Sequence, residues 1–395
     1  MVRERHRFER CRRIGNVAGQ MLRLAVILVV LGNLISWFFT VEAVAQERFD
    51  IPLEPSCEQC RIEVARLHAL RRTDGSIAFQ DRPRSIRRVL NGGYLLIADN
   101  GGIEFYDSTG MRDARSVGIV SGTALVGNPH DLMRSWDGRF RVIDPSRDDI
   151  TVFAPTGKRL HTSPFAFPVR RSGVVLGEDR LVLNLLIRDR DRVGYPLHLV
   201  TKDGRIIESF GANPPDYVLN APPTWMRVFS LAVDENAVWV AHQHEYTVEK
   251  WRLDEKGIEL ESILSRAPIW FPKSNGLVPV TLDEEPQVML LDVSQDTTGL
   301  HWVLSLVPGH EWRSGLCSVP HVDSGREYVT PCRPQLVFDS ILEVIDPSSA
   351  RVVTATRVPE CIIALLGNGH LVGYEAGDDG GVVTVYVSTL AGMSH

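Results

Sequence analysis

Residues 131–158, DLMRSWDGRFRVIDPSRDDITVFAPTGK, decide the fold because they hold two short strand patterns bounded by turn residues. The pair Asp137-Gly138 is a turn signal, and the apolar alternation after it predicts a strand over 139–143. A second strand is predicted over 150–153, followed by a turn at 155–158 whose Pro and Gly favour chain reversal. Two short strands joined by turns are the material of an antiparallel sheet.

The same unit recurs before and after this stretch. The further predicted strand pairs are 94–98 with 103–106, 180–183 with 197–201, and 238–241 with 247–253. The glycine of the outer turn falls at positions 110, 157, 204 and 257, which gives spacings of 47, 47 and 53 residues. A repeat of this length built from short alternating strands is typical of β-propeller blades.

Two more units complete the chain. The fifth contains predicted strands at 288–293, 300–306, 342–345 and 351–356, with an insertion at about 308–335, and the sixth contains 361–365, 370–374 and 382–387. The sixth unit lacks an outer strand. Residues 61–70 supply one, since Ile62 and Val64 alternate with polar residues and the pattern resumes at Leu67 after a phase shift. We expect this N-terminal strand to pair with 382–387 and close the ring, which removes two open sheet edges.

The unit over residues 127–158 resembles an NHL repeat in its Gly127-Asn128-Pro129 start, its Asp137-Gly138 turn and its final Gly157-Lys158. The chain as a whole is similar to the six-bladed β-propeller proteins of the NHL and TolB-like type found in bacterial envelopes. The resemblance implies an all-β fold: one six-bladed propeller of four-stranded antiparallel blades over residues 61–390. It also implies ligand sites around the central channel, on the face where each blade's second strand ends. Such motifs specify blades and not an activity.

The N-terminus has the layout of an export signal. Six arginines lie within the first thirteen residues, an apolar run covers 24–41, and Ala43-Val44-Ala45 offers a small-x-small cleavage site before Gln46. This predicts a signal peptide over 1–45, with residues 46–60 as a short lead-in. The alternative is an uncleaved anchor in which residues 24–41 span the inner membrane. Both place residues 46–395 outside the cytoplasm, in the periplasm or the medium.

The charge of the chain narrows the class of partner. Hydrophobic residues make up 44% and charged residues 23%, as in a globular protein. The first 45 residues carry a net charge of +4 within a total of −6, so the remainder carries −10. An acidic body argues against nonspecific nucleic-acid binding, which needs a basic footprint. We expect a protein, peptide or glycan partner, and membrane contact only through an uncleaved N-terminal segment.

The cysteines predict two disulfides in an oxidising compartment. Cys317 and Cys332 lie within the insertion, and a bond between them would stabilise it by about 3 kcal/mol on the chain-entropy model. Cys57 and Cys60 form a C-x-x-C pair that could be a redox pair, half a metal site or a structural disulfide, and we favour the disulfide because the other contexts are absent. Cys361 is expected to be a buried free thiol.

Polar residues end the second strand of each unit. They are Asp99, Asp144, Asn184, His242, Ser305 and Tyr374. Two carboxylates, an amide and an imidazole around a channel could bind a divalent cation. The alternative, which we favour, is that short polar side chains end strands by bonding to their own loop backbone.

Three further local patterns suggest chemistry. His242-x-His244 is metal-like, since alternate residues of a strand share a face, and Asp144 could add an oxygen ligand. His130 lies beside Asp131 near the channel, but no serine stands in a nucleophile elbow to complete a triad. Trp270 and Trp312 lie in connections, where they either recognise a ligand or pack the loops.

These observations favour a noncatalytic extracytoplasmic propeller that binds or scaffolds a protein, peptide or glycan through its blade loops. No catalytic residues are assigned, and no cofactor is expected apart from a possible divalent cation. The alternative is a metal-dependent hydrolase or lactonase with a cation in the central channel, because lactone-cleaving propellers resemble this fold. Asp99, Asp144, Asn184 and His242 would be its candidate ligands.

Overall fold

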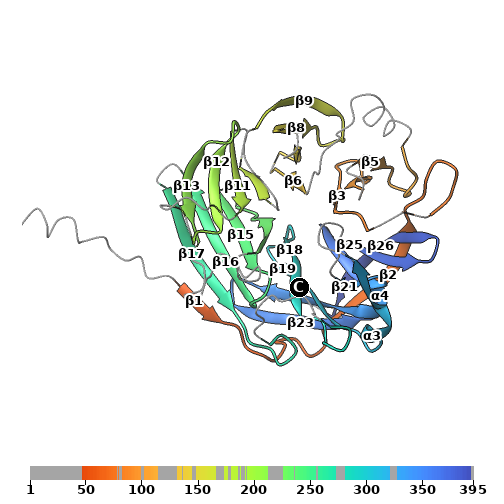
Figure 1. The fold of residues 1–395 in the computed structure, drawn as a ribbon. Helices are drawn as coiled ribbons and strands as arrows, with labels where there is room; N and C mark the ends of the chain where they lie inside the picture. The colour runs from red at the N-terminus through yellow and green to blue at the C-terminus, as the bar shows by residue number, and fades with distance from the viewer. Residues whose placement is uncertain are drawn as a thin grey trace, which may run out of the picture. The chain divides into compact units, whose positions relative to one another are not determined.

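The structure is a computed structural model. It describes residues 47–77, 79, 82–98, 102–113, 131–135, 137–144, 148–165, 173–176, 179–185, 187, 192, 194–211, 226–234, 236–254, 257–272, 281–320 and 327–392. These residues form six antiparallel sheets that are the blades of a β-propeller (Figure 1). The predicted fold class is therefore confirmed. Within the described residues, no helix has the length and apolar character needed to cross a membrane.

The first three blades follow the repeat seen in the sequence. Blade 1 is β3 (Ser85–Arg88), β4 (Tyr94–Ile97) and β5 (Ile103–Tyr106). Blade 2 is β6 (Leu132–Arg134), β7 (Phe140–Asp144), β8 (Asp149–Phe153) and β9 (Arg159–Pro164). Blade 3 is β10 (Gly173–Leu176), β11 (Arg180–Asn184), β12 (Leu197–Thr201) and β13 (Ile206–Phe210). Blade 1 has a bridge between Tyr106 and Arg112 in place of a fourth strand.

The last three blades are more elaborate. Blade 4 is β14 (Arg227–Leu231), β15 (Ala237–His242), β16 (Thr247–Asp254) and β17 (Gly257–Ser265). Blade 5 is β18 (Met289–Gln295), β19 (His301–Pro308), β22 (Phe338–Asp346) and β23 (Arg351–Val358). Blade 6 is β24 (Ile362–Gly367), β25 (His370–Gly377), β26 (Gly380–Ala391) and β2 (Arg61–Ala69).

Side-chain alternation builds the core between blades rather than within them. In β15, Val238 and Val240 pack on blade 3, while Trp239 and Ala241 pack on blade 5. Successive residues of a strand point to opposite faces, so a blade between two neighbours needs apolar residues in both phases. Six hydrophobic clusters result, one for each pair of neighbouring blades, including the pair formed by blades 6 and 1. The inner strands β3, β6, β10, β14, β18 and β24 contact one another in this cyclic order.

The predicted ring closure is confirmed. Strand β2 pairs antiparallel with β26 from Arg61 opposite Ala391 to Ala69 opposite Thr384. The phase shift seen in the sequence is a bulge, because the register changes between Arg66 and His68. The first and last strands of the ring thus lie in one sheet.

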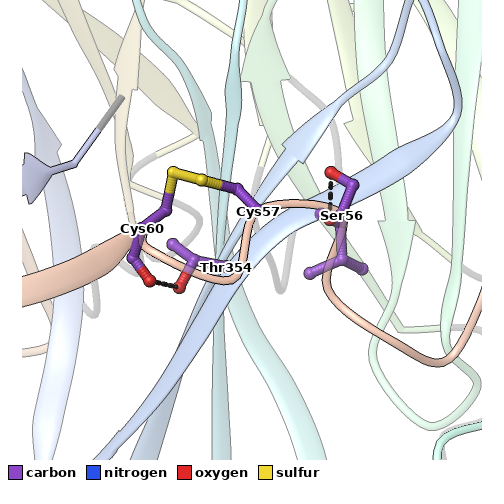
Figure 2. Close-up of a disulfide and its surroundings, with 5 residues drawn as sticks. Ser56, Cys57, Cys60 and Thr354 are labelled. Carbon is purple, nitrogen blue, oxygen red and sulfur yellow. Dashed lines mark hydrogen bonds between the residues drawn. A yellow bond between two sulfur atoms is a disulfide. The ribbon is translucent and has the colours of Figure 1, made fainter. Parts of the chain in front are cut away.

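The lead-in before β2 adds contacts that the sequence did not predict. Strand β1 (Glu47–Asp50) pairs parallel with β17 as a fifth strand of blade 4. The chain then passes the outer edge of blade 5, where Ser56 N donates to Val352 O at 2.8 Å. Cys57 and Cys60 form a disulfide, and Thr354 Oγ1 donates to Cys60 O at 2.9 Å (Figure 2). Residues 47–69 therefore run along three consecutive blades.

The insertion lies between the second and third strands of blade 5. It contains α3 (Trp312–Gly315), β20 (Leu316–Pro320), β21 (Glu327–Pro331) and α4 (Pro334–Val337). Cys317 and Cys332 form the predicted disulfide, and Cys361 is a buried free thiol, as predicted. The amide of Gln335 exchanges two hydrogen bonds with the backbone of Ala376, which fixes the insertion on blade 6.

Candidate functional site

Two cavities lie along the central channel. The first has a volume of about 560 Å³ and the second about 570 Å³. Four residues line both of them: Arg87, Gly173, Phe229 and Asp292. The first cavity opens among the connections between successive blades, as its lining residues Arg82 and Met226 show. The second opens among the turns that follow the inner strands, such as Val233 and Gly367.

All six blades contribute to the first cavity. Its walls come from the inner strands β3, β10, β14, β18 and β24, and from Asp131 directly before β6. This convergence follows from the fold, because every inner strand faces the channel. Four of the lining residues are arginines: Arg82, Arg84, Arg87 and Arg227. The carboxylates are Asp131 and Asp292, so the lining carries a net charge of +2 within an acidic protein.

Arg227 is held from the neighbouring blade. Its backbone N–H donates to Asn184 Oδ1 at 3.1 Å, and its Nη1 donates to Met226 O at 3.1 Å. The residue is only 2% exposed, and burial lowers the pKa of its guanidinium to about 10 although Glu249 and Glu245 oppose the shift. A guanidinium with this pKa is still protonated at pH 7. Arg227 therefore brings a fixed positive charge to the channel.

Arg87 belongs to a joint between blades 1 and 2. Its Nε donates to Leu132 O at 3.2 Å and its Nη2 lies 3.3 Å from Asp131 Oδ1. Ser85 Oγ donates to the same carboxylate oxygen at 2.7 Å. Three side chains and one carbonyl thus hold the inner strands β3 and β6 together. The charges of Arg87 and Asp131 largely offset each other.

Asp292 is the acidic residue shared by the two cavities. Its Oδ2 accepts a hydrogen bond from Leu365 N and its Oδ1 from Val293 N, at 2.8 and 2.9 Å. Burial nevertheless raises the pKa of this carboxyl group to about 6, against the effect of Arg87. The channel therefore becomes more positive as the pH falls through 6.

Of the predicted strand-end residues that the structure describes, Ser305 and Tyr374 lie inside β19 and β25, the other three lie at strand ends, and none lines either channel cavity. Asp144, Asn184 and His242 end β7, β11 and β15, and each is buried. Asn184 Nδ2 donates to Pro196 O at 2.9 Å while its Oδ1 holds Arg227. Asn184 thus bonds to loop backbone, the alternative that the sequence favoured. Its oxygen positions a channel arginine rather than a ligand.

His242 belongs to a buried hydrogen-bond network with Glu249 and Trp251. Its Nε2 lies 2.9 Å from Glu249 Oε1, and Trp251 Nε1 donates to Glu249 Oε2 at 2.8 Å. A carboxylate only accepts hydrogen bonds, so Nε2 carries the proton. Burial lowers the pKa of His242, and the charge of Arg227 lowers it further. His242 therefore supports Glu249 by a hydrogen bond, and the charge of Arg227 helps to lower the pKa of Glu249.

The other predicted site residues fall into three groups. Asp99 and His130 lie outside the described residues. Trp312 is only 9% exposed and packs in the cluster between blades 6 and 1, so loop packing is the alternative that holds for it. Trp270 is half-buried, with its ring 6.0 Å from that of Tyr246. Neither tryptophan lines a channel cavity.

The predicted cation site lacks a ligand set in the part of the chain that the structure describes. No three His, Cys, Asp or Glu side chains there are grouped so that they could hold a metal ion. His244 lies beyond the end of β15, where strand alternation no longer places it beside His242. The amide of Asn184 is occupied by backbone groups. The candidates that the structure describes are therefore not grouped into a three-ligand cation site.

The arginines of the first cavity were missed by the sequence reasoning, although a signal for them exists. Residues 82–88 read RPRSIRR, with four arginines in seven positions of an acidic body. The run begins before β3 and continues through it, and an inner strand faces the channel. Arg227 has no such signal, because it stands alone in sequence and reaches the cavity only through the ring.

Comparisons with known proteins find distant structural similarity. No family model matches the chain, and no curated protein matches its sequence. A DUF4221 family protein from Bacteroides vulgatus is 11% identical with a TM-score of 0.48, over 85% of this chain and 100% of that one. A candidate exported protein from Bacteroides fragilis is 8% identical with a TM-score of 0.48, over 87% and 99%. Virginiamycin B lyase from Staphylococcus aureus is 11% identical with a TM-score of 0.37, over 82% and 99%. What identifies this chain is its own set of six sheets and six inter-blade clusters, which make it a six-bladed β-propeller.

Proposed function

We propose that the protein is a noncatalytic, extracytoplasmic binding propeller, and that its peptide, protein or glycan ligand enters the first channel cavity. The observation that carries the proposal is the cavity itself: about 560 Å³, lined from all six blades and rich in arginine. Ligand sites are concave, of this size, and combine apolar walls with a few placed polar groups. The apolar part of this wall includes Met226, Phe229 and Ile363.

The chemistry of the lining favours binding over catalysis. The polar residues of the first cavity are arginines, two aspartates, Ser85 and Gln243, with no histidine, cysteine or lysine among the described lining residues. The Ser85 hydroxyl donates a hydrogen bond to Asp131 Oδ1, which Arg87 Nη2 also contacts. A nucleophilic serine needs a base that is itself oriented and free to take the proton. The groups around Ser85 instead lock two strands together.

The compartment rests on separate observations. The two disulfides indicate an oxidising, extracytoplasmic environment. The basic and apolar N-terminus supports export, with residues 1–45 as a signal peptide that leaves a periplasmic or secreted protein. An anchor over 24–41 is the alternative. The resemblance of residues 127–158 to an NHL repeat agrees with an envelope propeller.

The proposal is tested by filling the cavity. Met226 is half-buried and lines the first cavity, so Met226→Trp should occupy it, while Ile269→Trp adds the same ring at a site that is 96% exposed. The purified protein is screened by thermal shift against defined tri- and tetrapeptides and against an oligosaccharide panel, with hits confirmed by calorimetry. We expect a saturable ligand whose affinity falls at least tenfold in Met226→Trp and stays unchanged in Ile269→Trp.

Two results contradict the proposal. One is that no peptide or glycan binds saturably. The other is that a ligand binds equally well to the wild type and to Met226→Trp, which would move the site away from the channel. Melting curves of both variants without ligand show whether each is folded.

A further inference from the structure

Two arginines of the second cavity have no counter-charge beside them. Arg88 is the last residue of β3, and Arg134 is the last residue of β6. Both line the second cavity, and neither lines the first. Within the described residues, neither guanidinium has an ion-pair or hydrogen-bond partner. Two adjacent inner strands thus each end on a positive charge that no neighbouring side chain pairs with.

A ligand in the cavity can reach both guanidiniums. Arg134 is exposed to solvent. Arg88 is half-buried, and its Nε is buried, so a ligand reaches this residue through its terminal nitrogens. A guanidinium binds an oxyanion through parallel hydrogen bonds, and both carboxylate and phosphate fit this arrangement. The two arginines therefore favour an oxyanion as the group that enters between blades 1 and 2.

The carboxylates that line the same cavity are engaged by their own surroundings. Asp292 accepts hydrogen bonds from two backbone N–H groups. Asp296 accepts from two backbone N–H groups of its own turn and from the indole of Trp302. Neither carboxylate forms an ion pair with Arg88 or Arg134. The two aspartates therefore serve the framework of blade 5 and leave the arginines available.

Hydroxyl groups line the opposite side of the cavity. Ser294 of β18 and Thr297 in the turn after β18 both line it. Their hydroxyls have no hydrogen-bond partner among the described residues. Because the inner strands contact one another in cyclic order, blade 5 lies opposite blade 2 in the ring of six. The cavity thus offers cations on one side and hydroxyl groups on the other, with apolar walls such as Leu231 and Leu365.

We propose that the second cavity binds an acidic sugar, with its carboxylate or phosphate group at Arg88 and Arg134 and its hydroxyl groups toward Ser294 and Thr297. This site goes beyond the proposed function, whose ligand enters the first cavity, and does not depend on it. A neutral sugar would leave both guanidiniums without a counter-charge. A small inorganic anion would satisfy the arginines without using the hydroxyl groups of blade 5.

The test compares acidic sugars with ligands that carry only one of the two features. Calorimetry of the purified protein measures sodium glucuronate, glucose 6-phosphate, glucose and inorganic phosphate. We expect saturable binding of glucuronate or glucose 6-phosphate. Glucose and inorganic phosphate should bind roughly tenfold more weakly, because a hydrogen bond to a charged group contributes about that factor. The tighter of the two acids identifies the anion that the site prefers.

Substitutions of the two arginines locate the site. Arg88→Gln and Arg134→Gln should each weaken the acidic sugar roughly tenfold. The matched control is Arg205→Gln, which removes an equal charge at an exposed position that lines neither cavity and should leave the affinity unchanged. Melting curves without ligand show whether each variant is folded. Since Arg134 is exposed, its variant carries the test even if Arg88→Gln destabilises β3.

Several results would overturn the inference. They are no binding of either acid, equal binding of glucose or inorganic phosphate, and equal losses in Arg134→Gln and Arg205→Gln. The variant Met226→Trp separates this site from that of the proposed function, because Met226 lines only the first cavity. An acidic sugar that is lost in Met226→Trp and retained in the arginine variants would support the proposed function and remove this inference. An acidic sugar that depends on Arg134 and not on Met226 would support the inference whatever the first cavity binds.

Discussion

Among single residues, His301 has the most unusual environment. It is 1% exposed, and its ring lies 4.2 Å from that of Trp239 in an edge-on arrangement between blades 4 and 5. Neither ring nitrogen has a hydrogen-bond partner among the described residues. Burial lowers the pKa of His301 to about 3, although the charge of Asp296 opposes the shift. The ring is therefore an apolar packing element at neutral pH.

This environment predicts an acid-sensitive fold. In the unfolded chain His301 takes up a proton below about pH 6.5, whereas the folded protein resists protonation down to about pH 3, so stability is lost as the pH falls between these values. At pH 4.5 the loss from this group is about 3 kcal/mol. Urea unfolding at pH 7.5 and 4.5 should show that His301→Phe, which keeps the ring, loses about 3 kcal/mol less than the wild type. The exposed His161→Phe is the control. An equal loss in wild type and His301→Phe would show that His301 is protonated in the fold.

Among the elements, the insertion of blade 5 depends on two kinds of attachment. Trp312 and Val337 at its ends are buried in the cluster between blades 6 and 1. Gln335 is hydrogen-bonded to blade 6, and Arg333 Nη2 lies 2.7 Å from Oδ1 of the exposed Asp378. The hairpin of β20 and β21 between these ends holds the Cys317–Cys332 disulfide. Core packing thus fixes the ends, and the disulfide constrains the hairpin.

Removal of this disulfide should therefore loosen the hairpin and leave the blade. On the chain-entropy model, the double variant Cys317→Ser/Cys332→Ser lowers the free energy of the open form of this 16-residue segment by about 3 kcal/mol. Hydrogen exchange should accelerate by about 100-fold for amides of β20 and β21. Amides of β22 in the same blade serve as the internal reference and should not change. Equal acceleration in β22 would mean that the disulfide stabilises the whole blade.

For the whole molecule, the joint between the chain's two ends decides whether the ring is one cooperative unit. Strand β2 comes from the start of the chain and β26 from its end, yet they share one sheet. Ile62 of β2 is 5% exposed in the cluster between blades 5 and 6. Every blade packs on two neighbours, so opening this joint exposes apolar surface on both sides of blade 6.

A truncation inside this joint should destabilise the entire propeller. Ile62→Ala is expected to lower the free energy of unfolding by about 2–4 kcal/mol, as for other buried large-to-small changes. Leu67→Ala on the same strand, where the side chain is 49% exposed, should change it by about 0.5 kcal/mol or less. Urea unfolding followed by tryptophan fluorescence, to which Trp239 and Trp251 of blade 4 and Trp302 of blade 5 contribute, measures both variants. A wild-type midpoint for Ile62→Ala would show that blades unfold independently of the closure.

The fold was predictable because each blade is a local pattern. Strand alternation and turn residues recur within about 50 residues, and the alternation also located the break near Leu67 that the structure shows as a bulge between Arg66 and His68. Both disulfides and the buried thiol of Cys361 followed from cysteine spacing and context. The parallel pairing of β1 did not, since it depends on which distant edge is open.

The candidate site was not predictable to the same degree. By itself the sequence determined a six-bladed propeller, because strand period and turn chemistry act over a few residues. Only the tertiary structure decided which side chains share a cavity. The first cavity brings together Arg82 before blade 1, Gln243 of blade 4 and Ile363 of blade 6. These residues are far apart in the sequence, and no local pattern links them. They meet because the ring closes and turns every inner strand toward one channel.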